Sequence, residues 1–102
     1  MAHVSSYAHD MTFTVPAPSA NKVWAGLLSW KGYMASFTGL ITVRTAGRVL
    51  ENGDIRLRVS TIWEHEVQLD EWMSSDMTPG GLFVGVDPAI YDVIEETYEN
   101  LD

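Results

Sequence analysis

The chain has 102 residues, enough for one modest hydrophobic core and too few for two, so a single domain over residues 1–102 is expected. It contains no cysteine, which excludes disulfides, thiolate metal sites and a cysteine nucleophile. The net charge of −8 argues against nucleic-acid and membrane partners, because phosphates and anionic lipid surfaces attract basic proteins. With no recognisable signal peptide or membrane-spanning run, a soluble cytoplasmic protein is expected.

The charges are unevenly distributed along the chain. All six basic residues lie between Lys22 and Arg58, whereas residues 60–102 hold eleven acidic residues and no lysine or arginine. Such charge runs often do no more than keep a surface solvated. The alternative is that the acidic C-terminal segment lies against one of the four arginines, within a subunit or across a dimer interface. The intersubunit version predicts a salt-dependent dimer.

The first part of the chain predicts a strand followed by a helix. Residues 11–15 alternate and are rich in β-formers, and residues 1–10 before them are expected to be a loose N-terminal segment. From Ser19, apolar side chains recur at helical spacing to about Ala35. The Ser19 hydroxyl is expected to cap this helix by accepting a hydrogen bond from a free N–H.

A β-hairpin is predicted next. Residues 40–50 and 55–63 are rich in β-branched side chains, and the Asn-Gly pair at 52–53 tolerates the positive φ angles of tight turns. A two-residue loop would set Glu51 opposite Asp54, and like charges facing each other are unfavourable. A longer loop or a bulge is therefore the open alternative.

The last part of the chain does not have a pattern that decides between helix and strand throughout. Residues 64–73 predict a second helix, which the Thr-Pro-Gly-Gly sequence at 78–81 should break. Residues 90–98 also have helical spacing, and the Asp-Pro pair at 87–88 resembles a helix start. The order is then β-α-β-β-α plus one undecided element, which is compatible with an α+β, ferredoxin-like sandwich.

Three segments resemble the antibiotic-biosynthesis monooxygenase (ABM) domain, and the resemblance extends from about Met11 to Tyr98. Phe37-Thr38-Gly39-Leu40 is similar to that family's proline-glycine-phenylalanine corner, although the proline is missing. Ser60-Thr61-Ile62-Trp63-Glu64 is similar to its third strand, and residues 86–95 resemble its closing strand.

The resemblance implies that residues 90–98 form a fourth strand. The fold would be a βαββαβ antiparallel sheet with helices on one face. It also implies a homodimer, because in a dimeric α+β barrel the sheets of two subunits face each other.

Candidate site residues follow from the resemblance. Trp63 would line a cleft between sheet and helices, where its ring could stack on a flat substrate and its N–H could donate a hydrogen bond. The candidate catalytic residues are Trp63 and His65, the latter because imidazole transfers protons near neutral pH. The candidate substrate-binding residues are Trp24, Tyr33, Phe37, Trp63, Trp72 and Arg44. The alternative is that the aromatic residues are core and that Arg44 and His65 are solvated.

The expected function is cofactor-independent oxidation, by molecular oxygen, of a flat aromatic small molecule. The alternative is a non-catalytic ligand-binding or accessory dimer, because Val59 and Leu69 stand where some oxygenases have polar groups. Haem degradation is not expected, since Met73 stands where haem-degrading relatives have a histidine. His3 and His9, in the loose segment, are not expected to bind a metal. A cavity of roughly 300 Å³ or more beside Trp63 would favour ligand binding over a purely structural role.

Overall fold

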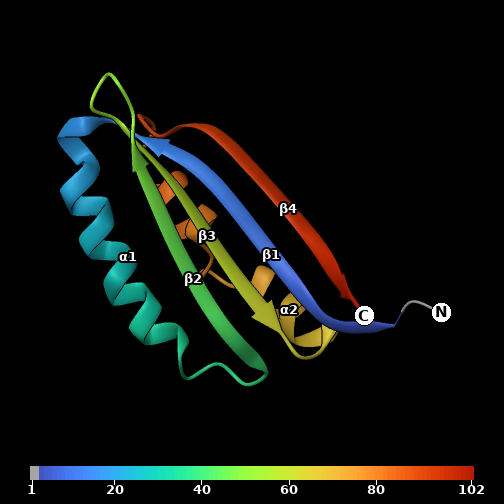
Figure 1. Cartoon of the computed structure of the whole chain (residues 1–102). Helices are drawn as coiled ribbons and strands as arrows, with labels where there is room; N and C mark the ends of the chain where they lie inside the picture. Colours follow the sequence, from blue (N-terminus) through green and yellow to red (C-terminus); the bar gives the residue numbers. More distant parts are fainter. Residues whose placement is uncertain (1–2) are drawn as a thin grey trace.

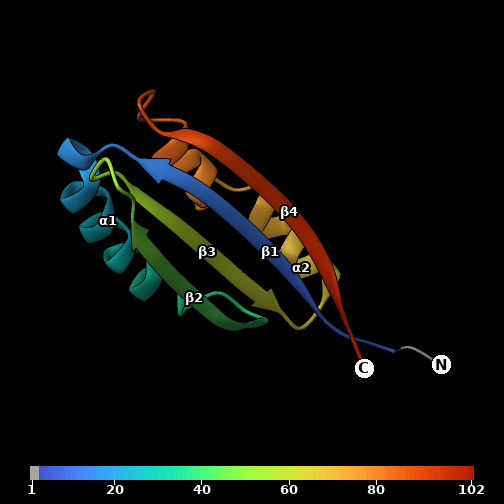
Figure 2. The same cartoon turned by 45° about the horizontal axis from the view of Figure 1, so that its top comes forward.

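The computed structural model of the protein describes residues 3–102. Its elements are β1 (Val4–Val15), the 3-10 turn η1 (Ala17–Ser19), α1 (Ala20–Met34), β2 (Leu40–Val49), β3 (Ile55–Trp63), α2 (Glu66–Met73), the π-helical turn η2 (Gly80–Val84) and β4 (Tyr91–Leu101). The strands form one antiparallel sheet in the order β2-β3-β1-β4. Both α-helices lie on one side of it (Figures 1 and 2). The predicted α+β, ferredoxin-like fold is confirmed.

Strand β1 is much longer than the sequence predicted. It begins at Val4 rather than Met11 and pairs with β3 on one side and β4 on the other. The N–H of His3 also donates to the carbonyl of Asp102, 3.3 Å away, so the start of β1 and the end of β4 lie together. The prediction of a loose N-terminal segment is therefore wrong for residues 4–10, and residues 1–2 lie outside the described part of the chain.

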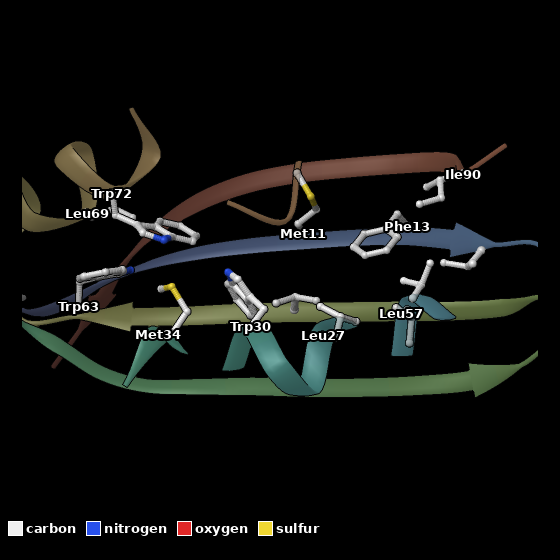
Figure 3. Close-up of a cluster of buried hydrophobic side chains, with 13 residues drawn as sticks. Met11, Phe13, Leu27, Trp30, Met34, Leu57, Trp63, Leu69, Trp72 and Ile90 are labelled. Atoms are coloured by element: carbon white, nitrogen blue, oxygen red, sulfur yellow. The ribbon is translucent and has the colours of Figure 1, made fainter. Parts of the chain in front are cut away.

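The core lies between the sheet and the helices. Alternate residues of β1 and β3 point to this side, because successive side chains of a strand face opposite ways. They meet the buried stripe of α1, in which Val23, Leu27, Trp30 and Met34 recur every three to four residues. Figure 3 shows these side chains filling the layer along the length of the sheet. Among residues 3–102, no helix covers the other face of the sheet (Figures 1 and 2).

Helix α1 begins without the predicted serine cap. The Ser19 side chain makes no capping hydrogen bond, and its backbone is already helical, with φ −98° and ψ −6°. The reason is that η1, which starts after Pro16, leads directly into α1, so the N–H of Ser19 donates to the carbonyl of Pro16 at 2.9 Å. The predicted span of the helix is otherwise confirmed.

The β2–β3 hairpin has the longer loop that the sequence left open. The N–H of Leu50 donates to the carbonyl of Asp54 at 2.8 Å, so Glu51 does not face Asp54, and Gly53 has φ +89°. The Asp54 carboxylate accepts the hydroxyl of Tyr91 and the N–H of Ala17. The hydroxyl of Tyr91, and then the Ala17 N–H, hold the pKa of this carboxyl below its usual value.

The α1–β2 corner packs on the β3–α2 junction through a glycine. Gly39 has φ +85°, and a Cβ built on it would lie 1.7 Å from the Oε1 atom of Gln68 on α2. The Gly39 carbonyl accepts the N–H of Glu64 at 2.8 Å. Helix α2 begins at Glu66, two residues later than predicted, because Glu64 is engaged in this contact.

The segment between α2 and β4 differs from the expected break. Residues 78–81 lead into the π-helical turn η2 rather than only ending a helix. In this turn the Gly85 N–H donates to the Gly80 carbonyl at 2.7 Å. The Asp87-Pro88 pair forms a turn rather than a helix start, and Asp87 accepts the N–H of Ala89. The fourth strand is confirmed as β4. Neither α-helix within residues 3–102 combines the length and apolar character that a membrane crossing needs.

Replacing Gly39 by alanine should destabilise the protein. The new methyl group would meet the Gln68 amide, and a residue with a side chain is strained at positive φ, so we expect a loss of about 1–3 kcal/mol in the free energy of unfolding. Urea denaturation measures it. Gly32→Ala is the matched control, because Gly32 lies in α1 with open space around the new Cβ, and it should stabilise by up to about 1 kcal/mol. Equal effects at both glycines would contradict the prediction.

Candidate functional site

Two tryptophans from different elements lie together at one end of the core. Trp63 closes β3 and Trp72 lies on α2, and both side chains are 1% exposed. Their ring centroids are 5.4 Å apart, and Phe37 from the α1–β2 corner stands edge-on to Trp63 at 6.2 Å. Figure 3 shows Trp63 and Trp72 beside each other, away from the Phe13 end of the core. Of the predicted binding residues, these three are brought together.

A pocket of about 330 Å³ opens beside this cluster. It is lined by Phe37, Thr38, Trp63, Gln68, Glu71 and Trp72. The volume lies at the lower end of the roughly 300–1,000 Å³ range of small-molecule sites, and the hollow lined by Phe83 and Val86 is larger, at about 440 Å³. The two indoles are almost fully buried, so Phe37 is the aromatic side chain that presents surface to it, and Glu71 is the acidic side chain at its edge. We call this space the tryptophan pocket.

The polar atoms of the residues around the tryptophan pocket differ in whether they have a hydrogen-bond partner. The indole N–H of Trp63 donates to the hydroxyl of Thr61 at 2.9 Å, so it is already engaged. The Nε1 of Trp72 and the Oε1 of Gln68 are both buried, with no hydrogen-bond partner among residues 3–102. An unpaired buried group costs about 1–3 kcal/mol. Both indole N–H groups are therefore enclosed in the core, that of Trp63 with a partner and that of Trp72 with none among residues 3–102.

A buried histidine supports Trp72 from the sheet. His9 lies on β1 and is 1% exposed, its Nε2 is 2.9 Å from the Oε1 of Glu95 on β4, and its ring meets Trp72 edge-to-face at a centroid distance of 5.1 Å. His9 was not predicted as a site residue because residues 1–10 were expected to be a loose segment. The available signal was the alternation of β1, in which Tyr7, His9 and Met11 share one face.

Four predicted site residues lie away from the tryptophan pocket. Trp24 and Tyr33 are 39% and 63% exposed on α1 and do not line it. His65 precedes α2, and its side chain is 63% exposed, with Glu64 at 3.9 Å. Arg44 is on the opposite face of the sheet. The structure thus separates His65 and Arg44 from Trp63, with which the sequence analysis had grouped them.

The helix-free face of the sheet has a pocket of its own. Its volume is about 320 Å³, and it is lined by Ala8, Asp10, Arg44, Ala46, Arg58, Ser60, Ile62, Tyr98 and Asn100. Arg58 Nε is 3.0 Å from Asp10 Oδ1, and the Ser60 hydroxyl donates to the same atom. Burial raises the pKa of the Asp10 carboxyl, but the hydrogen bonds from Arg58 and Ser60 outweigh it, so the pKa lies below its usual value.

This open face is divided by charge. Cross-strand pairing places Arg44, Arg48, Arg56 and Arg58 on β2 and β3, and Asp10 and Glu96 on β1 and β4. Hydrophobic side chains of β4 are exposed as well, with Ile94 at 52% and Tyr98 at 45%. Within residues 3–102, no group of three histidine or acidic side chains is arranged to hold a metal ion.

Comparison with known proteins supports the fold. No family model matches the chain, and no curated protein matches it. Solved structures do, among them a candidate antibiotic biosynthesis monooxygenase from Bacillus cereus, 22% identical with a TM-score of 0.66, covering 94% of this chain and 93% of that chain. A second candidate of that kind, from Caulobacter crescentus, is 13% identical with a TM-score of 0.73, covering 97% and 92%.

A third match is a protein from Bacteroides thetaiotaomicron described as a possible oxidoreductase. It is 13% identical, with a TM-score of 0.67, and the alignment covers 94% of this chain and 99% of that chain. At sequence identities this low, the structural similarity establishes the fold alone. The predicted resemblance to ABM proteins is therefore confirmed at the level of architecture.

Removing the His9 side chain should loosen the support of Trp72. His9→Ala leaves a cavity against Trp72 and takes the partner from Glu95, so we expect the free energy of unfolding to fall by roughly 2 kcal/mol in chemical denaturation. Glu95→Gln keeps a hydrogen-bond acceptor on a half-exposed side chain and should cost less than about 1 kcal/mol. If His9→Ala left the free energy of unfolding unchanged, the histidine would not support the pocket.

Proposed function

We propose that the protein binds a flat aromatic small molecule in the tryptophan pocket and oxidises it with molecular oxygen without a bound cofactor. The observation that carries this proposal is the 330 Å³ pocket walled by Trp63, Trp72 and Phe37. A planar ring can stack on the half-buried Phe37, which stands edge-on to the buried Trp63. The candidate monooxygenases and the possible oxidoreductase that share the fold support the oxidative part of the proposal.

The chemistry would use the substrate's own electrons. A substrate that loses a proton beside a phenolic ring becomes an electron-rich carbanion that can reduce oxygen directly. One oxygen atom then replaces the two hydrogens of a methylene group, and the other leaves as water. The protein would hold the ring, while Glu71 at the pocket edge could take the proton.

A non-catalytic ligand-binding role is the second candidate. Glu71 is the acidic side chain among the six that line the pocket, and neither His9 nor His65 lines it. Such a pocket offers good binding surface and few groups for proton transfer. Measuring affinity and oxygen uptake on the same sample separates the two functions.

The tryptophan pocket should bind a bicyclic or tricyclic phenol, and blocking its mouth should prevent this. Thr38 is exposed and lines the pocket, so Thr38→Trp should weaken the binding of 1,8-dihydroxyanthrone by about tenfold or more in calorimetry. Ser29→Trp, on the exposed side of α1, is the control and should bind as the wild type does.

Oxygen uptake that is faster with the protein than without it, and that disappears in Thr38→Trp, would support the enzymatic function. Binding without uptake would support the second candidate. An unchanged dissociation constant in Thr38→Trp would remove the tryptophan pocket as the binding site.

We also propose a homodimer in which the open sheet faces of two copies meet. This face carries no helix, exposes Ile94 and Tyr98, and is basic on β2 and β3 but acidic on β1 and β4. A two-fold axis parallel to the strands would set β2 of one copy over β4 of the other, so that each basic half covers an acidic half. In this arrangement Arg44 lies opposite Glu96 of the partner, because both belong to one cross-strand row.

The dimer should depend on charge in a specific way. Arg44→Glu would set like charges against each other and should raise the dissociation constant at low salt, measured by analytical ultracentrifugation. The exchanged pair Arg44→Glu with Glu96→Arg should restore it, since the two charges only trade places. High salt should reduce the difference. A monomeric wild-type protein, or a double variant as weak as the single one, would contradict this arrangement.

A further inference from the structure

A second hollow, of about 440 Å³, lies between the first half of α1 and the η2 turn, and opposite charges line it. Its lining includes Lys22, Val23 and Gly26 from α1, and Phe83, Val86 and Asp87 from η2 and the turn that follows. We call this space the η2 hollow. We propose that it binds an apolar α-amino acid as the zwitterion, with the carboxylate toward Lys22, the ammonium toward Asp87 and the side chain beside Phe83.

The η2 hollow is separate from the tryptophan pocket. Trp63 pairs with Tyr7 near the start of β1, whereas η1 and α1 follow the other end of β1 at Val15. The two spaces therefore lie toward opposite ends of the sheet, and they share no lining residue. A ligand in the η2 hollow is independent of the proposed oxidation, so either site can exist without the other.

Phe83 gives the η2 hollow an aromatic surface that a ligand can reach. Its side chain is half-buried, and a Cβ built at position 26 would lie 2.8 Å from its Cε1 atom. Gly26 thus lets the ring lie against α1, although a glycine inside a helix lowers stability relative to alanine. Val86, on the same side of the hollow, is 73% exposed. An apolar group of a ligand would remove this surface from water.

Lys22 and Asp87 supply opposite charges on the two walls. Lys22 is exposed on α1, and Asp87 is half-buried after η2. Within residues 3–102, neither side chain forms an ion pair with the other or with a third group. The Asp87 Oδ1 accepts the N–H of Ala89 at 3.0 Å, which holds the carboxylate at the turn. Two unpaired opposite charges in one hollow are complementary to a ligand that carries both.

The pair of charges distinguishes the zwitterion from simpler ligands. A carboxylate alone would meet Asp87 as well as Lys22 in a chain whose net charge is −8. An amine alone would leave Lys22 without a partner, and a hydrocarbon would leave both charges without one. An α-amino acid carries its ammonium and carboxylate on one carbon, and an apolar side chain suits Phe83 and Val86.

Three probes that share a phenyl ring test the proposal by NMR titration of ¹⁵N-labelled protein. These are L-phenylalanine, which carries both charges, 3-phenylpropionate, which has the carboxylate alone, and 2-phenylethylamine, which has the ammonium alone. L-Phenylalanine should shift the amide resonances of Gly26, Phe83 and Val86. It should bind about two- to fivefold more tightly than either analogue, as expected for solvent-accessible ion pairs. Equal affinities for the three probes, shifts confined to other residues, or no saturable shift would overturn the proposal.

Two variants assign the charges. Lys22→Met should weaken L-phenylalanine and 3-phenylpropionate about two- to fivefold and should not weaken 2-phenylethylamine. Asp87→Asn should weaken L-phenylalanine and 2-phenylethylamine by a similar factor and should not weaken 3-phenylpropionate. The asparagine oxygen can still accept the N–H of Ala89, so the turn should be retained.

Lys31→Met is the matched control. Lys31 is exposed on the same helix but does not line the η2 hollow, so this variant should bind L-phenylalanine as the wild type does. An equal loss in both lysine variants would attribute the effect to net charge and overturn the proposal. Thr38→Trp, which blocks the tryptophan pocket, should also leave L-phenylalanine binding unchanged. A loss of binding in Thr38→Trp would move the ligand to the tryptophan pocket and likewise overturn the proposal.

Discussion

The position of β1 in the middle of the sheet is the constraint on which the rest of the structure depends. Its twelve residues pair with β3 on one side and β4 on the other, so the first part of the chain joins the hairpin to the last strand. Because strand side chains alternate, β1 supplies both layers at once: His9 and Met11 to the core, and Asp10 to the open face. A shift of one residue would exchange these two sets.

The two faces of the sheet are suited to different tasks. The helix-covered face buries aromatic residues and contains the tryptophan pocket, whereas the open face combines ordered charges with exposed apolar side chains on β4. Arg58 and Asp10 are paired within the subunit, but Arg44 and Arg48 form no ion pair among residues 3–102. The unbalanced charge of this face therefore remains available to a partner.

Helix α2 connects the fold to the pocket. It is short, with eight residues, and contributes Leu69 and Trp72 to the core and Gln68 and Glu71 to the pocket. Its position is held by the Gly39–Glu64 contact at one end and by His9 beneath Trp72. These contacts keep the Gln68 amide oxygen and the Trp72 N–H buried without a hydrogen-bond partner among residues 3–102, at a cost in stability.

The sequence by itself determined the strand–helix order, the β2–β3 hairpin and the aromatic residues Phe37, Trp63 and Trp72, because strand alternation, turn residues and family motifs are local signals. Tertiary structure decided the rest. Pairing with β3 and β4 extended β1 back to Val4, and the packing of α2 on the sheet brought Trp72 against Trp63 and His9. The sequence suggested that Arg44 belongs to the same site as Trp63. Side chains alternate along β2, however, and Arg44 falls on the opposite face of the sheet. These outcomes depend on contacts between distant segments, which local patterns do not encode.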